Sequence, residues 1–219
     1  MSGPSSDKDA LRFMGRVSAD ISHEVTNVLA VLGELSGLLA DLAAADRARR
    51  RPLSAEKVSM TAEKLSAQVD RGKDIVRHFN RFAHSMDLAV TPVLLDEAIE
   101  RFAVLARRIA QRRRTEIVTA VGDVSVTMPL DAFALYRLLF DAFDRISEAY
   151  ETVEISSVSC GDGAEILFRG TAHRSVSTTV PAMSPAGAGS IGGLDADVET
   201  TDDEIRIRLM HEAAAHCKE

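Results

Sequence analysis

The stretch that decides the fold runs from Leu11 to Ala45, LRFMGRVSADISHEVTNVLAVLGELSGLLADLAAA. Its apolar residues recur at steps of three and four, the spacing of one face of a long α-helix. They are Met14, Val17, Ile21, Val25, Val28, Leu32, Leu35, Leu39 and Leu42. Two consecutive steps of four, at Val17, Ile21 and Val25, interrupt the pattern, and such a stutter locally unwinds a coiled coil. The stretch therefore predicts a long amphipathic helix with a coiled-coil seam.

A second helical pattern follows a break. The segment Asp46–Pro52, DRARRRP, ends the first helix, because basic residues suit a helix C-terminus and proline cannot continue the helix. Ser54 is a suitable N-cap, although Lys57 leaves the capping box incomplete. The second helix is expected to run to about Asp87. Its apolar stripe comprises Leu65, Val69, Gly72, Val76, Phe79, Ala83 and Met86. Two such helices form a hairpin and two hairpins enclose a four-helix core, so residues 11–88 predict a homodimer.

Residues 89–219 mix helical and strand patterns, whereas residues 1–10 are read as a polar tail. Helices are expected from Val93 to about Arg113 and from Ala132 to Tyr150. The strand candidates are 116–119, 124–128, 153–157, 164–169, 196–200 and 204–210, with Gly161-Asp162-Gly163 as a hairpin turn. Ser, Thr, Pro and Gly dominate residues 171–193, which predicts a loop. Hairpin-linked strands mixed with helices predict an α+β sandwich.

Composition narrows the classes of function. The 219 residues include no tryptophan and two tyrosines, and the net charge is -7. Such a chain lacks the basic, aromatic surface that nucleic-acid binding needs. Cys160 and Cys217 have no metal-site or redox spacing, which suits a reducing compartment. No apolar run is expected to cross a membrane, and the first ten residues lack a signal-peptide core. We therefore expect a soluble, cytoplasmic protein that binds neither membrane nor nucleic acid.

His23 is the strongest candidate for chemistry. Because Ile21 and Val25 belong to the seam, His23 should project toward solvent, with Asn27 one turn further along the same face. The Glu24 carboxylate could accept a hydrogen bond from one ring nitrogen and leave the other as a nucleophile. An ordinary surface histidine is the competing interpretation. A zinc-binding H-E-x-x-H helix would need a second histidine where Asn27 stands.

The run SADISHEVTNVLAVL, residues 18–32, resembles the H-box of two-component sensor histidine kinases. The resemblance implies that His23 is the phosphoacceptor and Glu24 the acid–base and orienting residue. It also implies that Asn27 positions a water or a phosphoryl oxygen beside His23. The family carries this box on the first helix of a dimeric hairpin, which is the architecture that the periodicity predicts. Val28 stands where many members have proline.

In that family an ATP-binding α/β sandwich follows the hairpin, but here its nucleotide elements are altered. In the helix Tyr136–Asp144, Arg137 and Asp141 occupy the positions of family asparagines. Asp141 could still hold magnesium, whereas Arg137 could not. The adenine-recognising Asp-x-Gly-x-Gly element reads RGTAH at residues 169–173. The run GAGSIGG at residues 187–193 resembles a phosphate-cradling loop, although such runs are more often linkers. We therefore expect a degenerate ATP-binding domain with no bound cofactor and no metal.

A phosphoacceptor hairpin joined to a degenerate ATP-binding domain looks like a dimeric histidine phosphotransferase rather than an ATP-dependent kinase. Such a protein relays phosphoryl groups between aspartates of response-regulator receiver domains, here through His23, and magnesium would come from the receiver. A sensor kinase is a further candidate partner. Two alternatives stay open: an atypical histidine kinase or phosphatase, and a non-catalytic dimeric scaffold that binds receivers. The arginine-rich residues 49–51 and 107–114 could contact acidic partners, although solvated helix ends are the simpler interpretation.

Overall fold

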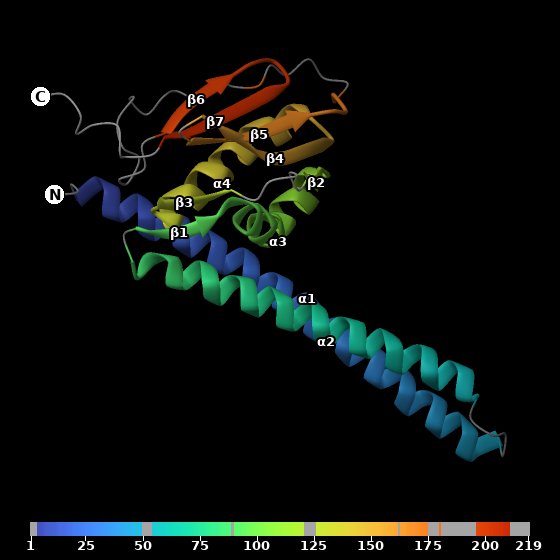
Figure 1. Cartoon of the computed structure of the whole chain (residues 1–219). Coiled ribbons are helices and arrows are strands. Elements are labelled where there is room, and N and C mark those ends of the chain that lie inside the picture. Colours follow the sequence, from blue (N-terminus) through green and yellow to red (C-terminus); the bar gives the residue numbers. More distant parts are fainter. Residues whose placement is uncertain are drawn as a thin grey trace, which may run out of the picture.

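The computed structural model describes residues 4–49, 54–88, 90–120, 126–161, 163–174, 180 and 196–210 of the chain. Two long antiparallel helices, α1 (Pro4–Arg49) and α2 (Ala55–Ala83), form a hairpin that projects from an α/β domain (Figure 1). A helical hairpin followed by an α/β sandwich is the predicted fold class, which the coordinates confirm for the single chain.

The two helices begin at signals that the sequence contains. α1 starts at Pro4, so residues 4–10 belong to the helix and not to a separate polar tail. Proline is favoured in the first turn because its missing N–H would have no helical partner there. Before α2, the hydroxyl oxygen of Ser54 accepts a hydrogen bond from the backbone N–H of Lys57 at 3.4 Å, as expected of an N-cap. The short 3-10 helix His84–Met86 continues the chain to the expected boundary.

An apolar seam joins α1 and α2. Its buried side chains are Val17, Ile21 and Val28 of α1 and Thr61, Ile75 and Phe82 of α2. The α1 residues are those predicted, but the α2 stripe is rotated, because Val69, Val76 and Met86 are 41%, 45% and 45% exposed. Helices in a four-helix bundle carry adjacent apolar faces, and a single hairpin covers only one of them. Periodicity alone does not separate these two faces.

The α/β domain is a layer of two helices on a five-stranded sheet. The strand order is β2 (Glu116–Ala120), β4 (Thr152–Cys160), β5 (Gly163–Gly170), β7 (Glu204–Met210) and β6 (Ala196–Thr200). β2 pairs with β4 in parallel, and the other pairs are antiparallel. Alternate residues of β4, β5 and β7 are buried against α3 (Leu95–Arg113) and α4 (Ala132–Ala149), as strands with one covered face require (Figure 1).

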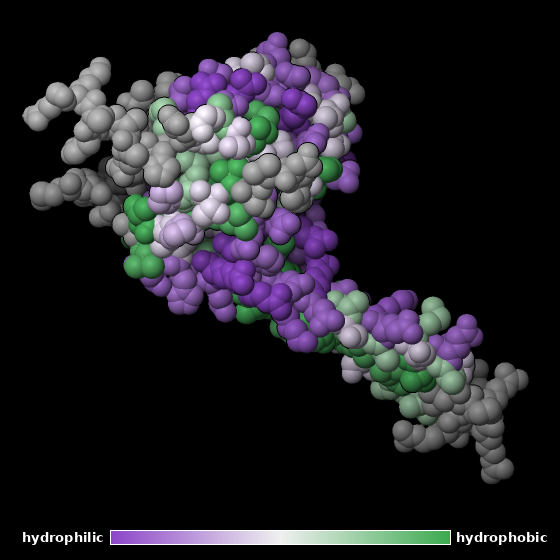
Figure 2. All heavy atoms as spheres, in the orientation of Figure 1, coloured by the Kyte–Doolittle hydropathy of each residue, from purple (hydrophilic) through white to green (hydrophobic). Residues whose placement is uncertain are grey.

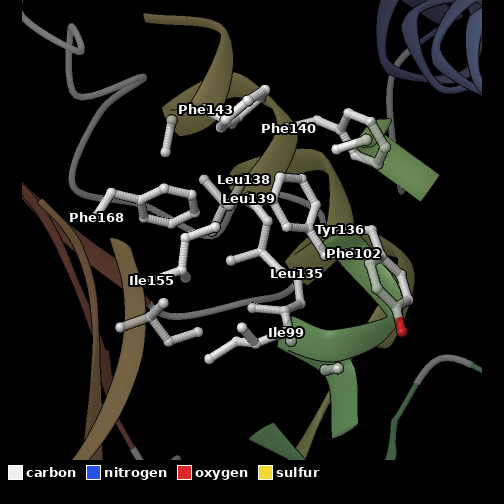
Figure 3. Close-up of a cluster of buried hydrophobic side chains, with 14 of the residues drawn as sticks. Ile99, Phe102, Leu135, Tyr136, Leu138, Leu139, Phe140, Phe143, Ile155 and Phe168 are labelled. Atoms are coloured by element: carbon white, nitrogen blue, oxygen red, sulfur yellow. The ribbon is translucent and has the colours of Figure 1, made fainter. Parts of the chain in front are cut away.

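The core of this domain lies between α4, α3 and the sheet. Its centre is aromatic, since Phe102 of α3 packs edge-on against Phe140, Phe143 and Phe168 with ring centroids 5.0, 5.9 and 6.1 Å apart (Figure 3). Each fully buried side chain of this size contributes about 1.5–3 kcal/mol to folding. This cluster therefore fixes both helices on the sheet.

Some element boundaries differ from the sequence expectation. The helix expected from Val93 begins at Leu95, because residues Thr91–Leu94 pair as β1 with β3 (Thr127–Leu130). Both strands contain a proline, which lacks the N–H for a central strand but is tolerated in a two-stranded edge ladder. The expected hairpin turn between β4 and β5 is confirmed, and Gly161 adopts a φ of +52°, which glycine tolerates without strain.

The α/β domain packs on the N-terminal part of the hairpin. Phe13 of α1 contacts Phe133 and Phe140 of α4, with ring centroids 5.5 and 5.3 Å apart. Beside this contact, the Arg16 guanidinium lies 2.9 Å from the Asp144 carboxylate. The remainder of α1 and α2 extends beyond the α/β domain (Figure 1).

The segment Lys8–Ala45 of α1 is long and apolar enough to cross a membrane by length and composition, with a hydropathy of 1.8 in its most apolar window. On these criteria the expectation that no apolar run reaches this length is wrong. The seam residues, together with the alanines and the exposed Leu29, Val31 and Leu38 between them, raise the hydropathy to this level.

Candidate functional site around His23

His23 lies on the exposed surface of α1, as predicted, two residues beyond the buried seam residue Ile21. Asn27 is exposed four residues later, so the two side chains share one helix face. Between them Thr26 donates a hydrogen bond from its hydroxyl to the carbonyl oxygen of Ser22 at 2.8 Å. The imidazole and the amide therefore stand together on a solvent-accessible helical surface.

Glu24 has a different environment from its neighbour. Its side chain is 2% exposed, and Arg71 of α2 donates a hydrogen bond to its Oε2 at 2.9 Å. Oε1 is buried without a hydrogen-bond partner among the described residues. Successive helical residues are turned by about 100°, so the carboxylate points toward α2 while His23 points outward. The structure thus does not show the predicted Glu24–imidazole bond, and an orienting role for Glu24 would require another rotamer.

Two arginines of α3 approach α1 one turn before His23. The Asp20 carboxylate is 7% exposed and lies 3.3 Å from Nε of Arg108 and 3.6 Å from a terminal guanidinium nitrogen of Arg112. These contacts bring the C-terminal end of α3 to the edge of the candidate site. Figure 2 shows hydrophilic residues gathered over the surface where the hairpin leaves the α/β domain.

Sequence reasoning did not find Asp20, Arg71 or these two arginines as parts of the site. The available signal was weak: Asp20 and Arg71 are charged residues next to the apolar seam positions Ile21 and Gly72. Charges beside a seam often pair across it. The pattern does not identify the partner.

The acidic residues of α4 are engaged with arginines. Asp141 lies 3.3 Å from Nε of Arg145, which is one turn along the same helix. Asp144 contacts both Arg16 of α1 and Arg113 of α3, at 2.9 and 3.2 Å. Arg137 is half-buried on the same helix. Among the described residues, no group of three or more His, Cys, Asp or Glu side chains could hold a metal ion.

The residues RGTAH, 169–173, begin at the end of β5 and lie beside Tyr150. Gly170, at the end of β5, packs so closely under the Tyr150 ring that an added Cβ would lie 2.2 Å from it. The Tyr150 hydroxyl donates a hydrogen bond to the carbonyl oxygen of Asp202 at 2.9 Å. The glycine-rich run at residues 187–193 lies outside the described residues.

Two of the cavities that the described residues form open elsewhere on the surface. One, of about 420 Å³, lies between α3 and β2 and includes Val104, Arg107 and Gln111 on its lining. The other, of about 320 Å³, lies where α2 meets β1 and α3 and includes Arg81 and Arg101. Neither is lined by Arg137 or Asp141.

No protein-family model matches the chain, and no curated protein matches it. Solved structures share its arrangement at low similarity. The histidine kinase AdeS of Acinetobacter baumannii is 10% identical, with a TM-score of 0.39, over 87% of this chain and 98% of that chain. A bacterial phosphotransferase is 13% identical, with a TM-score of 0.41, over 89% and 94%. The histidine kinase ThkA in complex with the response regulator TrrA is 14% identical, with a TM-score of 0.40, over 92% and 62%. These TM-scores are too low to assign chemistry to this chain.

Proposed function

We propose that this protein is a dimeric histidine phosphotransferase that relays phosphoryl groups between aspartates of response-regulator receiver domains through His23. The observation that carries the proposal is the exposed His23 on the outer face of a two-helix seam, with Asn27 beside it. A partner domain can reach such an imidazole without any opening of the fold. Because the surrounding seam is packed, the helix holds the nucleophile in one position.

The transfer needs little from this chain beyond an accessible nucleophile. A ring nitrogen of neutral His23 attacks the phosphorus of an aspartyl-phosphate on the receiver. An N–P bond forms while the O–P bond breaks, and the aspartate leaves as a carboxylate with the electron pair of that bond. The proton on the opposite ring nitrogen passes to water, and the reverse sequence charges a second receiver. Magnesium bound by the receiver would neutralise the phosphoryl oxygens during both steps.

The environment of α4 supports a relay rather than a kinase. Asp141, the one candidate magnesium ligand that the sequence suggested there, is paired with Arg145. Arg137 adds a positive charge where the resemblance implies asparagine. Asp144 is engaged by Arg16, a contact that joins α4 to the hairpin. We infer that this domain has a structural role and that phosphoryl groups arrive from outside the chain.

The exposed surface of the hairpin supports a dimer. Leu29 and Leu38 of α1 are 61% and 47% exposed, and Val69 and Val76 of α2 are 41% and 45% exposed. Apolar side chains repeated along a hairpin are covered when two hairpins form a four-helix bundle. A second copy of this chain would cover them. The same apolar residues also explain why α1 has the hydropathy of a membrane span, and a relay between receivers places the protein in the cytoplasm.

The decisive experiment is incubation of the purified protein with receiver domains carrying labelled aspartyl-phosphate. Label should appear on the wild-type protein and pass to a second receiver, and it should be absent from His23→Ala. His84→Ala is the matched control, since it removes another exposed histidine from the base of the same hairpin. Wild-type protein that never acquires label would overturn the proposal.

The same mixtures separate the alternatives. Autophosphorylation from labelled ATP and magnesium would establish a kinase. Loss of receiver phosphate that requires Asn27 but leaves no label on His23 would establish a phosphatase. Binding to receivers without any movement of label would establish a scaffold.

A further inference from the structure

The Asp20 carboxylate brings two guanidinium groups next to His23. It is 7% exposed and is flanked by Arg108 at 3.3 Å and Arg112 at 3.6 Å. Two cations on one carboxylate leave a surplus of one positive charge at this point of the surface. The helix places Asp20 and His23 about 4.5 Å apart along its axis and about 60° apart around it. The surplus charge therefore lies on the side of α1 next to the imidazole.

The two arginines differ in what they can do. The side chain of Arg108 is 27% exposed, and its Nε is buried without a hydrogen-bond partner among the described residues. Arg112 is 57% exposed and makes the longer contact to Asp20. The next residue, Arg113, is engaged with Asp144 and Glu148 at 3.2 and 3.4 Å. Arg112 is thus the guanidinium of this group that is both held near His23 and open to a ligand.

We propose that Arg112 contacts the phosphoryl group as His23 receives it, which makes it a catalytic residue supplied by the α/β domain. This proposal rests on the proposed function, in which His23 carries phosphate. A phosphoryl group carries close to two negative charges, and a guanidinium binds two of its oxygens at once. Phosphoryl transfer depends largely on cations that stabilise these oxygens. Arg112 would remain beside the phosphohistidine after the receiver and its magnesium depart.

A small phosphodonor tests this proposal without any receiver. With phosphoramidate, the His23 ring nitrogen forms an N–P bond while the P–N bond of the donor breaks. Ammonia leaves with the electron pair of that bond, and the opposite ring nitrogen releases its proton to water. The rate of phosphohistidine formation is followed by ³¹P NMR. We expect Arg112→Gln to slow this rate on the order of tenfold, the effect of losing one charge-assisted hydrogen bond.

Matched variants separate charge at the site from general effects. Arg107→Gln removes an exposed arginine of α3 that lines the α3–β2 cavity. In this variant His23 should be phosphorylated at the wild-type rate. Arg112→Lys retains the charge but not the contact to two oxygens, so it should recover only part of the rate. The ³¹P shift of the phosphohistidine should differ between wild type and Arg112→Gln, a readout that a merely structural residue would not change. The thermal midpoint of unfolding should change little, because Arg112 is mostly exposed and Arg108 remains paired with Asp20.

Equal rates for wild type, Arg112→Gln and Arg107→Gln would overturn the assignment of Arg112. If phosphoramidate charges His23 but no phosphorylated receiver does, the relay fails while the effect of Arg112 is still measured. If neither donor charges His23, both proposals fail.

Discussion

The neighbouring residues His23 and Glu24 of α1 lie in different environments, because Glu24 forms an ion pair with Arg71 of α2. His23 faces solvent, whereas the Glu24 carboxylate is buried and joined to α2. Removing one partner of a buried pair leaves the other charge uncompensated, which costs more than an exposed pair contributes. We expect Arg71→Met to lower the free energy of unfolding by about 2–4 kcal/mol, measured by urea denaturation. Arg77→Met, which breaks an exposed pair with Asp74, should cost less than about 1 kcal/mol.

The double variant Glu24→Gln/Arg71→Met supplies the control for this prediction. It removes both charges, so much of the lost stability should return. Equal destabilisation by Arg71→Met and Arg77→Met would contradict the buried-pair interpretation.

His78 gives the hairpin a pH dependence. It is half-buried on α2, and its Nδ1 has no hydrogen-bond partner among the described residues. Burial and, next, the Arg101 guanidinium lower the pKa of His78 below its ordinary value of 6.5. The unfolded state then binds a proton more readily than the folded state, so stability declines as the pH falls through 6.5.

We expect His78→Gln to reduce the fall in unfolding free energy between about pH 7.5 and 5.5, measured by urea titrations at each pH. Phe79→Leu changes the same part of α2 without removing a titrating group, and it should keep the wild-type slope. Parallel pH curves for His78→Gln and wild type would show that the lowered pKa has no effect on stability.

At the scale of elements, Gly72 sets the distance between α1 and α2. A Cβ at this position would lie 3.3 Å from Cγ1 of Val28, whereas a Cβ at Gly15 of α1 would meet nothing within 4 Å. Gly72→Leu should therefore force the helices apart and destabilise the protein by about 1–3 kcal/mol. Gly15→Leu should instead be neutral or stabilising by up to about 1 kcal/mol, because leucine favours a helix over glycine. Thermal unfolding measures the stability of both variants. A Gly72→Leu protein as stable as the wild type would contradict the close approach of α1 and α2 at this position.

At the scale of the whole molecule, the uncovered apolar face of the hairpin predicts the oligomeric state. We expect wild-type protein to sediment as a dimer and Val76→Glu to sediment as a monomer, because the charge would have to be buried in the bundle. Val118→Glu on β2 is the matched control, since Val118 is 41% exposed on the sheet edge, away from the hairpin. Sedimentation equilibrium measures both. A monomeric wild type, or dissociation by Val118→Glu alone, would rule out this interface.

Much of the architecture could be predicted locally. The apolar period of α1 identified the seam, and it also indicated that His23 and Asn27 are exposed. The turn at Gly161 follows from the Gly-Asp-Gly run between two alternating runs. The start of α1 and the strands β1 and β3 were harder to predict from the sequence. Pro4 and the paired prolines of that ladder are compatible with several conformations until a partner segment is present.

What the sequence determined by itself is the four long helices, the strands of the five-stranded sheet and the exposure of the phosphoacceptor candidate, because these follow from the local apolar period of the chain. Only the tertiary structure decided the environment of the site. Glu24 meets Arg71 from a second helix, Asp20 meets Arg112 from another domain, and Phe13 reaches Phe140 of α4. Periodicity indicates that a residue faces a partner but does not indicate which partner. These pairings form only when packing brings together segments that lie far apart in the chain.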